Sequence, residues 1–342
     1  MPSSDPTDRD PVVSLFATMR DEPRGRVDAL LDSLAAQDFA GELELVIAVP
    51  PADVASVTAS TARWARGRVC VIENPSGLRS QGLNRALDHS RGTYAVRVDA
   101  RSRPTPDHVR RCVARLQTEP AVGVVGGVQG VAPIEGAAPM ADGIGRALNN
   151  RWLLGNAAYR DPAASGAVDT VYLGAFRTAE ATRLRYDEDL TANEDYDLCQ
   201  RYRALGSTVW LERGLTVAYE PRTRLDDLFG QYHAFGRSKV AYWQRSGRGP
   251  AGRQQLAIGV GVLAVAAAAA AARKPRRLTL GATAVVAIYA TTDLLSDRRT
   301  GRRSVPMRTR AASICAHCAI QTGWLSGIVV EAAAARRRRR VR

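Results

Sequence analysis

An alternation of apolar runs and amphipathic segments in the first 100 residues constrains the fold more than any other feature of this chain. Four apolar runs read as buried strands: Val12–Met19, Glu44–Val49, Arg68–Glu73 and Thr93–Asp99. Segments of helical period separate them, at Arg26–Gln37, Val54–Arg66 and Leu83–Ser90. Strands alternating with helices at this spacing predict an α/β fold with a mainly parallel, doubly wound sheet.

Polar side chains stand where these strands end, namely Arg20, Glu22, Asn74 and Asp99. Ligands of such sheets bind at the carboxyl ends of the strands. The sequence therefore predicts a ligand site at this edge.

The pattern continues through the middle of the chain. We expect a helix at Pro106–Leu116, a long helix at Leu225–Arg245, and strands at Val122–Val131, Asp169–Phe176, Thr208–Leu211 and Leu215–Tyr219. Ile144–Tyr159 is amphipathic and is compatible with packing in the core or against a membrane.

The segment Tyr186–Arg203 gathers carboxylates just before a helical pattern that ends near Gly206. Glu194 and Asp195 fall at the start of this helix. Acids at a helix N-terminus are favoured by the helix dipole, so the pattern fits a well-capped helix start as well as a functional pair of acids.

The net charge of +14 is concentrated near the C-terminus. Residues 273–342 contain sixteen Lys or Arg and three acids, which leaves only +1 for residues 1–272. This distribution argues against nucleic-acid binding by the main domain.

Three apolar runs follow Gly252, at Leu256–Ala272, Leu278–Thr292 and Ala311–Ala335. Each is close to the length that crosses a bilayer, and the first two also fit a buried Ala-rich hairpin. Six arginines in Arg298–Arg310 favour a cytoplasmic location for that loop, yet a three-pass arrangement then places two other basic segments outside. One run lying in the membrane interface would relieve this conflict.

The ends and the cysteines complete this outline. Residues 1–11 are polar, with no apolar core typical of a signal peptide, and we expect them to be disordered. The five cysteines favour free thiols in a reducing compartment. Cys315, His317 and Cys318 have metal-like spacing but no second ligand pair, which argues against a metal site.

Taken in order, several of these segments resemble the family 2 glycosyltransferases. The segments are the first strand with Arg20 and Glu22, then Glu73–Asn84 (ENPSGLRSQGLN), Val96–Arg101 (VRVDAR), Asp169–Arg177 (DTVYLGAFR), Asn193–Arg203 and Gln231–Lys239 (QYHAFGRSK). The nearest branch is the membrane-attached bacterial enzymes of exopolysaccharide assembly, of the succinoglycan type. The match covers about residues 12–245 and extends weakly to Gly323–Val329 (GWLSGIV).

The resemblance implies a GT-A fold, with a Rossmann-like sheet, over residues 12–247. A membrane-associated region of two to three helices would follow at 253–335, and a basic tail at 336–342. It implies donor contacts from Arg20, Glu22, Asn74, Gly82, Asn84, Asp99 and Arg101. By the same resemblance Asp195 is the catalytic base and Glu194 its neighbour, while Gly174, Gln231 and Arg237 face the acceptor or the diphosphate. Arg237 also fits a solvated helix face.

Two positions depart from the family pattern. Arg101 stands where the family has the second acid of its metal motif, so Asp99 is the one remaining candidate ligand for Mg²⁺ or Mn²⁺. Arg101 could offset phosphate charge instead. Ala48–Asp53 (AVPPAD) replaces the usual base-binding turn, which leaves Asp53 as a candidate only.

The resemblance thus implies an inverting transferase that moves a sugar from a nucleotide-diphospho-sugar to a lipid-linked or polysaccharide acceptor. It would act as a multi-pass protein of the cell membrane with a cytoplasmic catalytic domain, in contact with lipids and other glycan-assembly proteins. The alternative is a non-catalytic nucleotide-sugar-binding scaffold, which the two departures favour and the intact Glu194–Asp195 pair opposes. A dinucleotide enzyme is excluded, because RDEPRGR follows the first strand in place of a Gly-rich turn.

Overall fold

The computed structural model describes residues 12–131, 138–150, 157–250, 252, 254, 255, 258, 259, 283, 287–297 and 305–341. The chain divides into two compact units. Unit 1 comprises residues 1–130 and 162–219, and unit 2 comprises residues 131–161 and 220–342.

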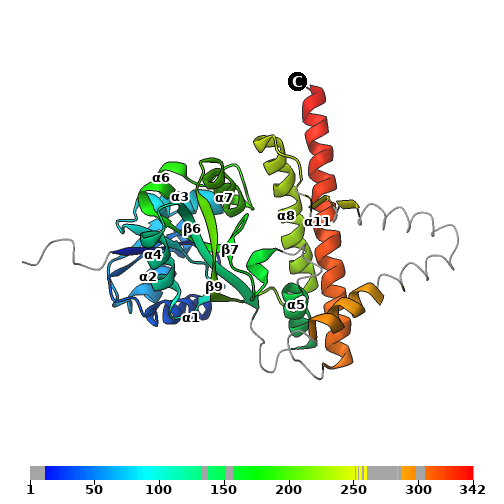
Figure 1. Ribbon diagram of the computed structural model, residues 1–342, viewed down its shortest axis with the longest axis horizontal. Helices are drawn as coiled ribbons and strands as arrows, with labels where there is room; N and C mark the ends of the chain where they lie inside the picture. Colours follow the sequence, from blue (N-terminus) through cyan, green and yellow to red (C-terminus); the bar gives the residue numbers. More distant parts are fainter. Residues whose placement is uncertain are drawn as a thin grey trace, which may run out of the picture. The chain divides into compact units, whose positions relative to one another are not determined.

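Unit 1 is built on a single sheet, which Figure 1 shows with helices beside it. The strand order is β3-β2-β1-β4-β8-β6-β9-β5, and β7 pairs with β9. The strands are β1 Val13–Thr18, β2 Leu43–Val49, β3 Val69–Glu73, β4 Tyr94–Arg97, β5 Ser102–Pro104, β6 Val122–Val131, β7 Gly166–Ala167, β8 Tyr172–Arg177 and β9 Thr208–Tyr219.

The sheet is mixed, which corrects the prediction of a mainly parallel one. Strands β3, β2, β1 and β4 pair in parallel, as the β–α alternation predicts. Strand β8 pairs antiparallel with both β4 and β6, and β9 pairs antiparallel with β5 and β7. An apolar run has the same appearance in either orientation, so periodicity alone does not reveal this change.

Strand β9 also differs from expectation. The two predicted strands, Thr208–Leu211 and Leu215–Tyr219, form one continuous strand. Gly214 adopts a φ of 69° within it, and that glycine and the polar residues beside it made the sequence appear interrupted.

Helices cover both faces of the sheet. One face packs on α1 (Arg24–Ala35), α2 (Val54–Thr61) and α4 (His108–Thr118), through a core that includes Leu15 and Val96. The other face carries α3 (Arg79–Asp88), α6 (Thr178–Leu184) and α7 (Glu194–Ala204). There Phe16, Phe176 and Tyr202 form a chain of ring contacts, 6.4 Å and 5.9 Å between centroids. Successive residues of a strand point to opposite faces, which is how one strand contributes to both layers.

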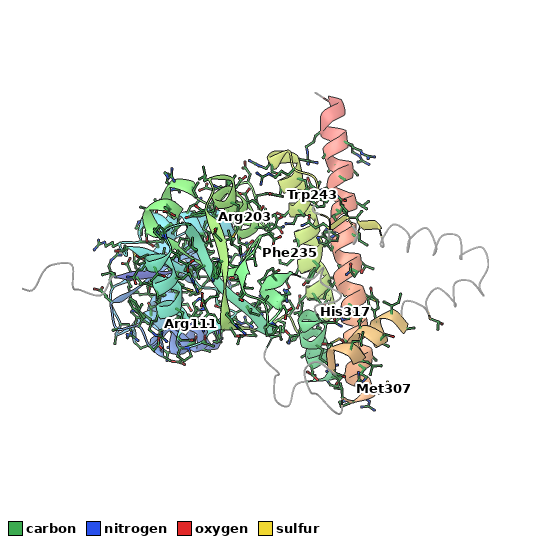
Figure 2. The ribbon with its side chains drawn as sticks, viewed as in Figure 1. Arg111, Arg203, Phe235, Trp243, Met307 and His317 are labelled. Carbon is green, nitrogen blue, oxygen red and sulfur yellow. The ribbon has the colours of Figure 1, made fainter. Side chains whose placement is uncertain are left out.

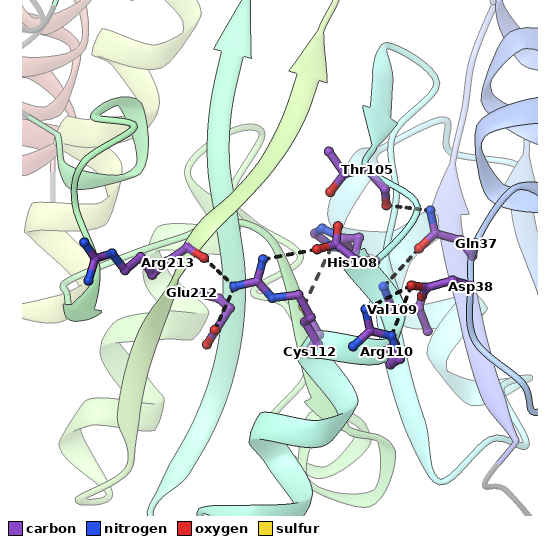
Figure 3. A network of polar contacts seen from close by, with 11 residues as sticks. Gln37, Asp38, Thr105, His108, Val109, Arg110, Cys112, Glu212 and Arg213 are labelled. Atoms are coloured by element: carbon purple, nitrogen blue, oxygen red, sulfur yellow. Dashed lines mark hydrogen bonds and ion pairs between the residues drawn. The ribbon is translucent and has the colours of Figure 1, made fainter.

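A polar network fixes the start of α4 (Figure 3). The Gln37 side chain accepts a hydrogen bond from the Val109 amide and donates to the Thr105 carbonyl, at 3.0 and 2.8 Å. Gln37 thereby supplies the cap that α4 does not receive from Asp107. Next to it, His108 and Cys112 are fully buried, with 3.9 Å between the Cys112 sulfur and His108 Nε2.

Unit 2 consists mainly of helices: α5 (Pro139–Asn149), a helix over residues 287–297, α8 (Leu225–Ser246) and α11 (Met307–Val341). Figure 2 shows side chains on α8, Phe235 and Trp243 among them, and His317 on α11. Helices α8 and α11 pack closely. A Cβ on Gly327 of α11 would lie 2.1 Å from the His233 carbonyl oxygen, and one on Gly236 of α8 would lie 2.1 Å from the Trp324 carbonyl oxygen.

A buried ionic network joins the other helices of unit 2. Arg146 of α5 contacts Asp293 and Asp297 at 2.9 and 2.7 Å, and Arg310 of α11 contacts the same two acids at 2.8 and 2.6 Å. Buried charges are tolerated when each is paired in this way.

One helix among the described residues, Met307–Arg338, is long and apolar enough to cross a membrane. It contains the third predicted apolar run. Most of the first run, Leu256–Ala272, and much of the second, Leu278–Thr292, lie outside the described residues. All five cysteines are described, and all are free.

Candidate active site

The carboxyl ends of β1 and β3 bring the first predicted residues together. Arg20 follows β1 and is exposed, and its side chain lies against Gly77, whose Cβ position is 3.4 Å from Arg20 Cδ. Gly77 belongs to the turn between β3 and α3, where a φ of 63° suits glycine. Asn74 organises this turn: it is buried, its amide donates to the Leu78 carbonyl, and its carbonyl oxygen accepts from Ser76. Asn74 therefore stabilises the turn from inside the protein, through its side-chain hydrogen bonds.

Asp53 takes part in the same edge through the backbone. Its carboxylate accepts a hydrogen bond of 3.0 Å from the amide of Asp21, a residue at a φ of 51°. The side chain thus holds the loop after β1.

Glu22 and Arg101 lie next to each other, with 4.0 Å between the Glu22 carboxylate and Arg101 Nε. Glu22 also pairs with Arg26 at 2.6 Å. Both predicted donor residues are largely buried, so each helps to fix the position of the other.

Asp99 stands between two guanidinium groups. Its Oδ2 is 3.4 Å from Arg79 Nη1, and its Oδ1 is 3.6 Å from Arg97 Nε. Burial by itself would raise the pKa of Asp99, but the charges of Arg97 and Arg79 outweigh this effect and lower the pKa. Asp99 is therefore a charged carboxylate that already has two cationic partners.

Arg97 continues this line of charges to the start of α7. Its Nη2 donates to Glu194 Oε1 at 3.0 Å, and both side chains are almost completely buried. Burial raises the pKa of Glu194, the Arg97 charge opposes that rise, and the charge of Asp195 adds to it. Asp195, the next residue, is only partly buried. Of the two predicted acids, Glu194 is bound by Arg97, and Asp195 is the one that reaches solvent.

Helix α3 holds the loop that leads into α7. Residues 80, 84 and 88 share one face of this helix because they are four positions apart. Ser80 donates to the Leu190 carbonyl at 3.1 Å, Asn84 exchanges hydrogen bonds with the backbone of Tyr186, and Asp88 pairs with both terminal nitrogens of Arg185. Asn84 also donates to Glu188. The predicted donor residue Asn84 thus lies inside the protein, where it positions the acid stretch.

Gly82 has a steric role in α3. A Cβ at this position would lie 2.2 Å from Thr18 Oγ1 and 2.7 Å from Asn74 Nδ2. Only glycine lets α3 approach β1 this closely, which brings the turn at Asn74 to the end of that strand.

Three further predicted residues belong to β8 and α8. Gly174 is buried within β8, where a Cβ would lie 2.7 Å from the Phe176 ring. Gln231 and Arg237 belong to α8 of unit 2. Arg237 is exposed on α8, as expected for a solvated helix face, and pairs there with Glu331 of α11 at 3.1 Å.

The residues around Asp99 do not fit a divalent cation. Such ions prefer several oxygen ligands, and Asp99 is one carboxylate flanked by Arg79 and Arg97, with Arg101 two residues further on. A divalent ion about 5 Å from a guanidinium is repelled by about 7 kcal/mol at an effective dielectric constant of about 20. No cluster of three or more His, Cys, Asp or Glu suited to a metal occurs among the described residues.

Residues 18–171 match the family model "Glycosyl transferase family 2". Residues 18–171 therefore form a family 2 glycosyltransferase domain. The match begins at Thr18, the last residue of β1, and includes the turn at Asn74, α3 and Asp99.

Two further comparisons describe the relatives of this domain. The succinoglycan biosynthesis protein ExoA of Rhizobium meliloti (strain 1021) is 27% identical over 204 residues, which are 58% of this chain and 59% of that protein. The alignment thus spans less than two thirds of the relative's length. The structure of the mannosyltransferase PcManGT from Pyrobaculum calidifontis, in complex with GDP-Man and Mn²⁺, superposes with a TM-score of 0.57 at 18% identity, over 96% of this chain and 88% of that one. The superposition shows that the fold is GT-A.

Sequence reasoning missed Arg79 and Arg97. A signal existed for each in the family 2 domain. Arg97 is a charge within an otherwise apolar strand, which requires a buried partner. Arg79 is the first residue of α3, where the helix dipole disfavours a cation unless an acid lies nearby. The partner of each is Asp99, which periodicity alone could not identify.

Proposed function

We propose that this chain is an inverting glycosyltransferase that moves a sugar from a nucleotide-diphospho-sugar to a lipid-linked or polysaccharide acceptor at the cytoplasmic face of the membrane. Residues 12–247 would carry the transfer and residues 253–335 the membrane attachment. The family 2 domain supports the reaction class, and the similarity to an exopolysaccharide biosynthesis protein supports the kind of product.

One observation supports the reaction most directly. Glu194 is bound by Arg97, whereas Asp195 beside it remains partly exposed at the start of α7. Inverting transfer needs one carboxylate to take the proton of the acceptor hydroxyl as that oxygen attacks the anomeric carbon. The proposal assigns this role to Asp195 and gives Glu194 the role of orienting the helix start.

The donor would lie at the carboxyl edge of β1, β3 and β4. Arg20, Arg79 and Arg101 supply positive charge there, and guanidinium groups bind phosphate oxygens in a bidentate manner. The GDP-Man complex of the Pyrobaculum calidifontis enzyme agrees with a diphosphate-sugar donor for this fold.

A panel of nucleotide-diphospho-sugars tests this proposal with the full chain in detergent. We expect one nucleotide class to raise the melting temperature, because a ligand at about 100 times its Kd stabilises a folded protein by about 2.7 kcal/mol. The same compound should donate its labelled sugar to a lipid fraction, with inversion at the anomeric carbon by NMR. Failure of every nucleotide sugar to stabilise the chain or transfer its sugar would contradict the proposal.

A further inference from the structure

We propose that Arg79 takes the place of a divalent cation at the donor diphosphate, so that transfer by this chain needs no metal. This inference rests on the proposed function, because it concerns the leaving group of that reaction. It begins with Asp99, the one acid that remains of the expected metal motif.

Both oxygens of Asp99 face guanidinium nitrogens, Arg79 at 3.4 Å and Arg97 at 3.6 Å. A metal ion would have to displace or repel both groups to reach the carboxylate. The position two residues further on carries Arg101, beside Glu22, where a second acid would be needed. The local charges therefore favour an anion over a cation at this edge.

Arg79 and Arg97 differ in their access to solvent. The Arg97 side chain is only 5% exposed and is committed to Glu194 at 3.0 Å. The Arg79 side chain is 50% exposed and touches Asp99 with one terminal nitrogen. Arg79 can thus keep its contact with Asp99 while its other nitrogens bind phosphate oxygens.

The reaction step balances without a metal. The bond between the anomeric carbon and the phosphate oxygen breaks, and its electron pair stays on that oxygen. The acceptor oxygen forms a new bond to the anomeric carbon, and its proton passes to the Asp195 carboxylate. Arg79 offsets the negative charge that develops on the leaving diphosphate. Asp99 acts as a positioning residue that orients Arg79.

The test measures binding of UDP, GDP and dTDP to the full-length protein in excess EDTA and in saturating Mn²⁺. We expect one of them to bind in EDTA, with a Kd that differs by less than about threefold from its Kd in Mn²⁺. This difference is smaller than the tenfold change in Kd that corresponds to about 1.4 kcal/mol. R79M should weaken this binding by about tenfold or more, as expected for a lost charge-assisted hydrogen bond. R79K keeps the charge but not the planar guanidinium, so its affinity for the nucleotide should lie between those of the wild type and R79M.

R85M is the matched control, since Arg85 is an exposed arginine on the same helix. Circular dichroism and melting temperature show whether each variant folds. If R79M does not fold, the comparison of wild-type binding in EDTA and in Mn²⁺ still tests the inference. Binding that appears only with Mn²⁺, or equal loss in R79M and R85M, would overturn the inference and leave the proposed function intact. No binding under either condition would overturn both.

Discussion

His108 shows how a single buried residue contributes to the pH dependence of the stability of unit 1. It lies fully buried at the start of α4, and burial lowers its pKa from 6.5 to about 4. Below pH 6.5 the unfolded chain binds a proton at this position that the folded chain does not bind. This part of the stability is therefore present above pH 6.5 and is lost as the pH falls toward 4.

We expect the free energy of unfolding of His108→Leu to fall less than that of the wild type as the pH is lowered. The wild type should lose up to about 3 kcal/mol between pH 7 and pH 4 through this residue, the value of a shift of about 2.5 pKa units. Urea unfolding of both proteins at a series of pH values measures the difference. His89→Leu, at an exposed position, is the control. Parallel profiles for wild type and His108→Leu would show that His108 does not titrate on unfolding.

The residues of the site were only partly predictable. Asp99, Glu194 and Asp195 could be found because acids at a strand end and at a helix start leave a local pattern. Asn84 and Gly82 were predicted as donor contacts, and the structure shows both buried, where they support the edge. Their contacts join positions about 60 to 100 residues apart, and no local pattern contains that information.

At the scale of elements, α3 and the loop before α7 together hold the start of α7 in place. Asn84→Asp keeps the oxygen that accepts from the Tyr186 amide but loses the donors to Tyr186 and Glu188. We expect a loss of about 1–3 kcal/mol in stability, as for a buried group left without its partner. Transfer should fall more than nucleotide binding, because the change displaces the start of α7.

Melting temperature, nucleotide Kd and transfer rate measure these effects side by side, with Arg85→Ala as the control on the exposed face of α3. A variant with wild-type stability and transfer would show that this support is dispensable.

The contact between α8 and α11 depends on glycine. Gly327→Ala places a Cβ 2.1 Å from the His233 carbonyl oxygen, so the helices must separate, whereas Gly230→Ala on α8 meets no atom within 4 Å. We expect the first change to destabilise unit 2 by about 1–3 kcal/mol through overpacking. The second should be neutral or stabilising by up to about 1 kcal/mol, through helix propensity. A change in melting temperature of the same sign in both variants would contradict this packing.

Most elements were predictable, because strand and helix periods differ. Strand β6 lies at Val122–Val131 and helix α8 at Leu225–Ser246, within one residue of expectation. Helix α3 begins at Arg79, four residues before the predicted start at Leu83. The polar residues of its first turn concealed it, and one of them, Arg79, contacts Asp99.

At the scale of the whole molecule, the two units interleave along the chain. Residues 131–161 belong to the same compact unit as α8 and α11, although residues 162–219 separate them along the chain. Contacts such as Arg146 with Asp293 and Asp297 decide this grouping, and they join segments about 150 residues apart. Composition reveals where charge and apolarity change along a chain but not which segments pack together.

Membrane attachment is a testable property of the intact chain. Helix Met307–Arg338 is long and apolar enough to span a bilayer, and five consecutive arginines, Arg336–Arg340, overlap its end. We expect the full-length protein to stay with the membrane fraction in alkaline carbonate and in high salt, and to be released by detergent. Release by salt alone would show that electrostatic attraction to lipid, without insertion, holds the protein.

The central claim is that Asp195 takes the proton from the acceptor in a reaction whose donor binds at the adjacent sheet edge. The most direct measurement compares nucleotide-sugar binding and sugar transfer in wild type and Asp195→Asn, with Asp189→Asn, an exposed acid of the same loop, as control. We predict that Asp195→Asn keeps donor binding within about threefold, while its transfer rate falls by about 10²–10⁴, the usual contribution of a general base. Transfer at the wild-type rate by Asp195→Asn would contradict the claim.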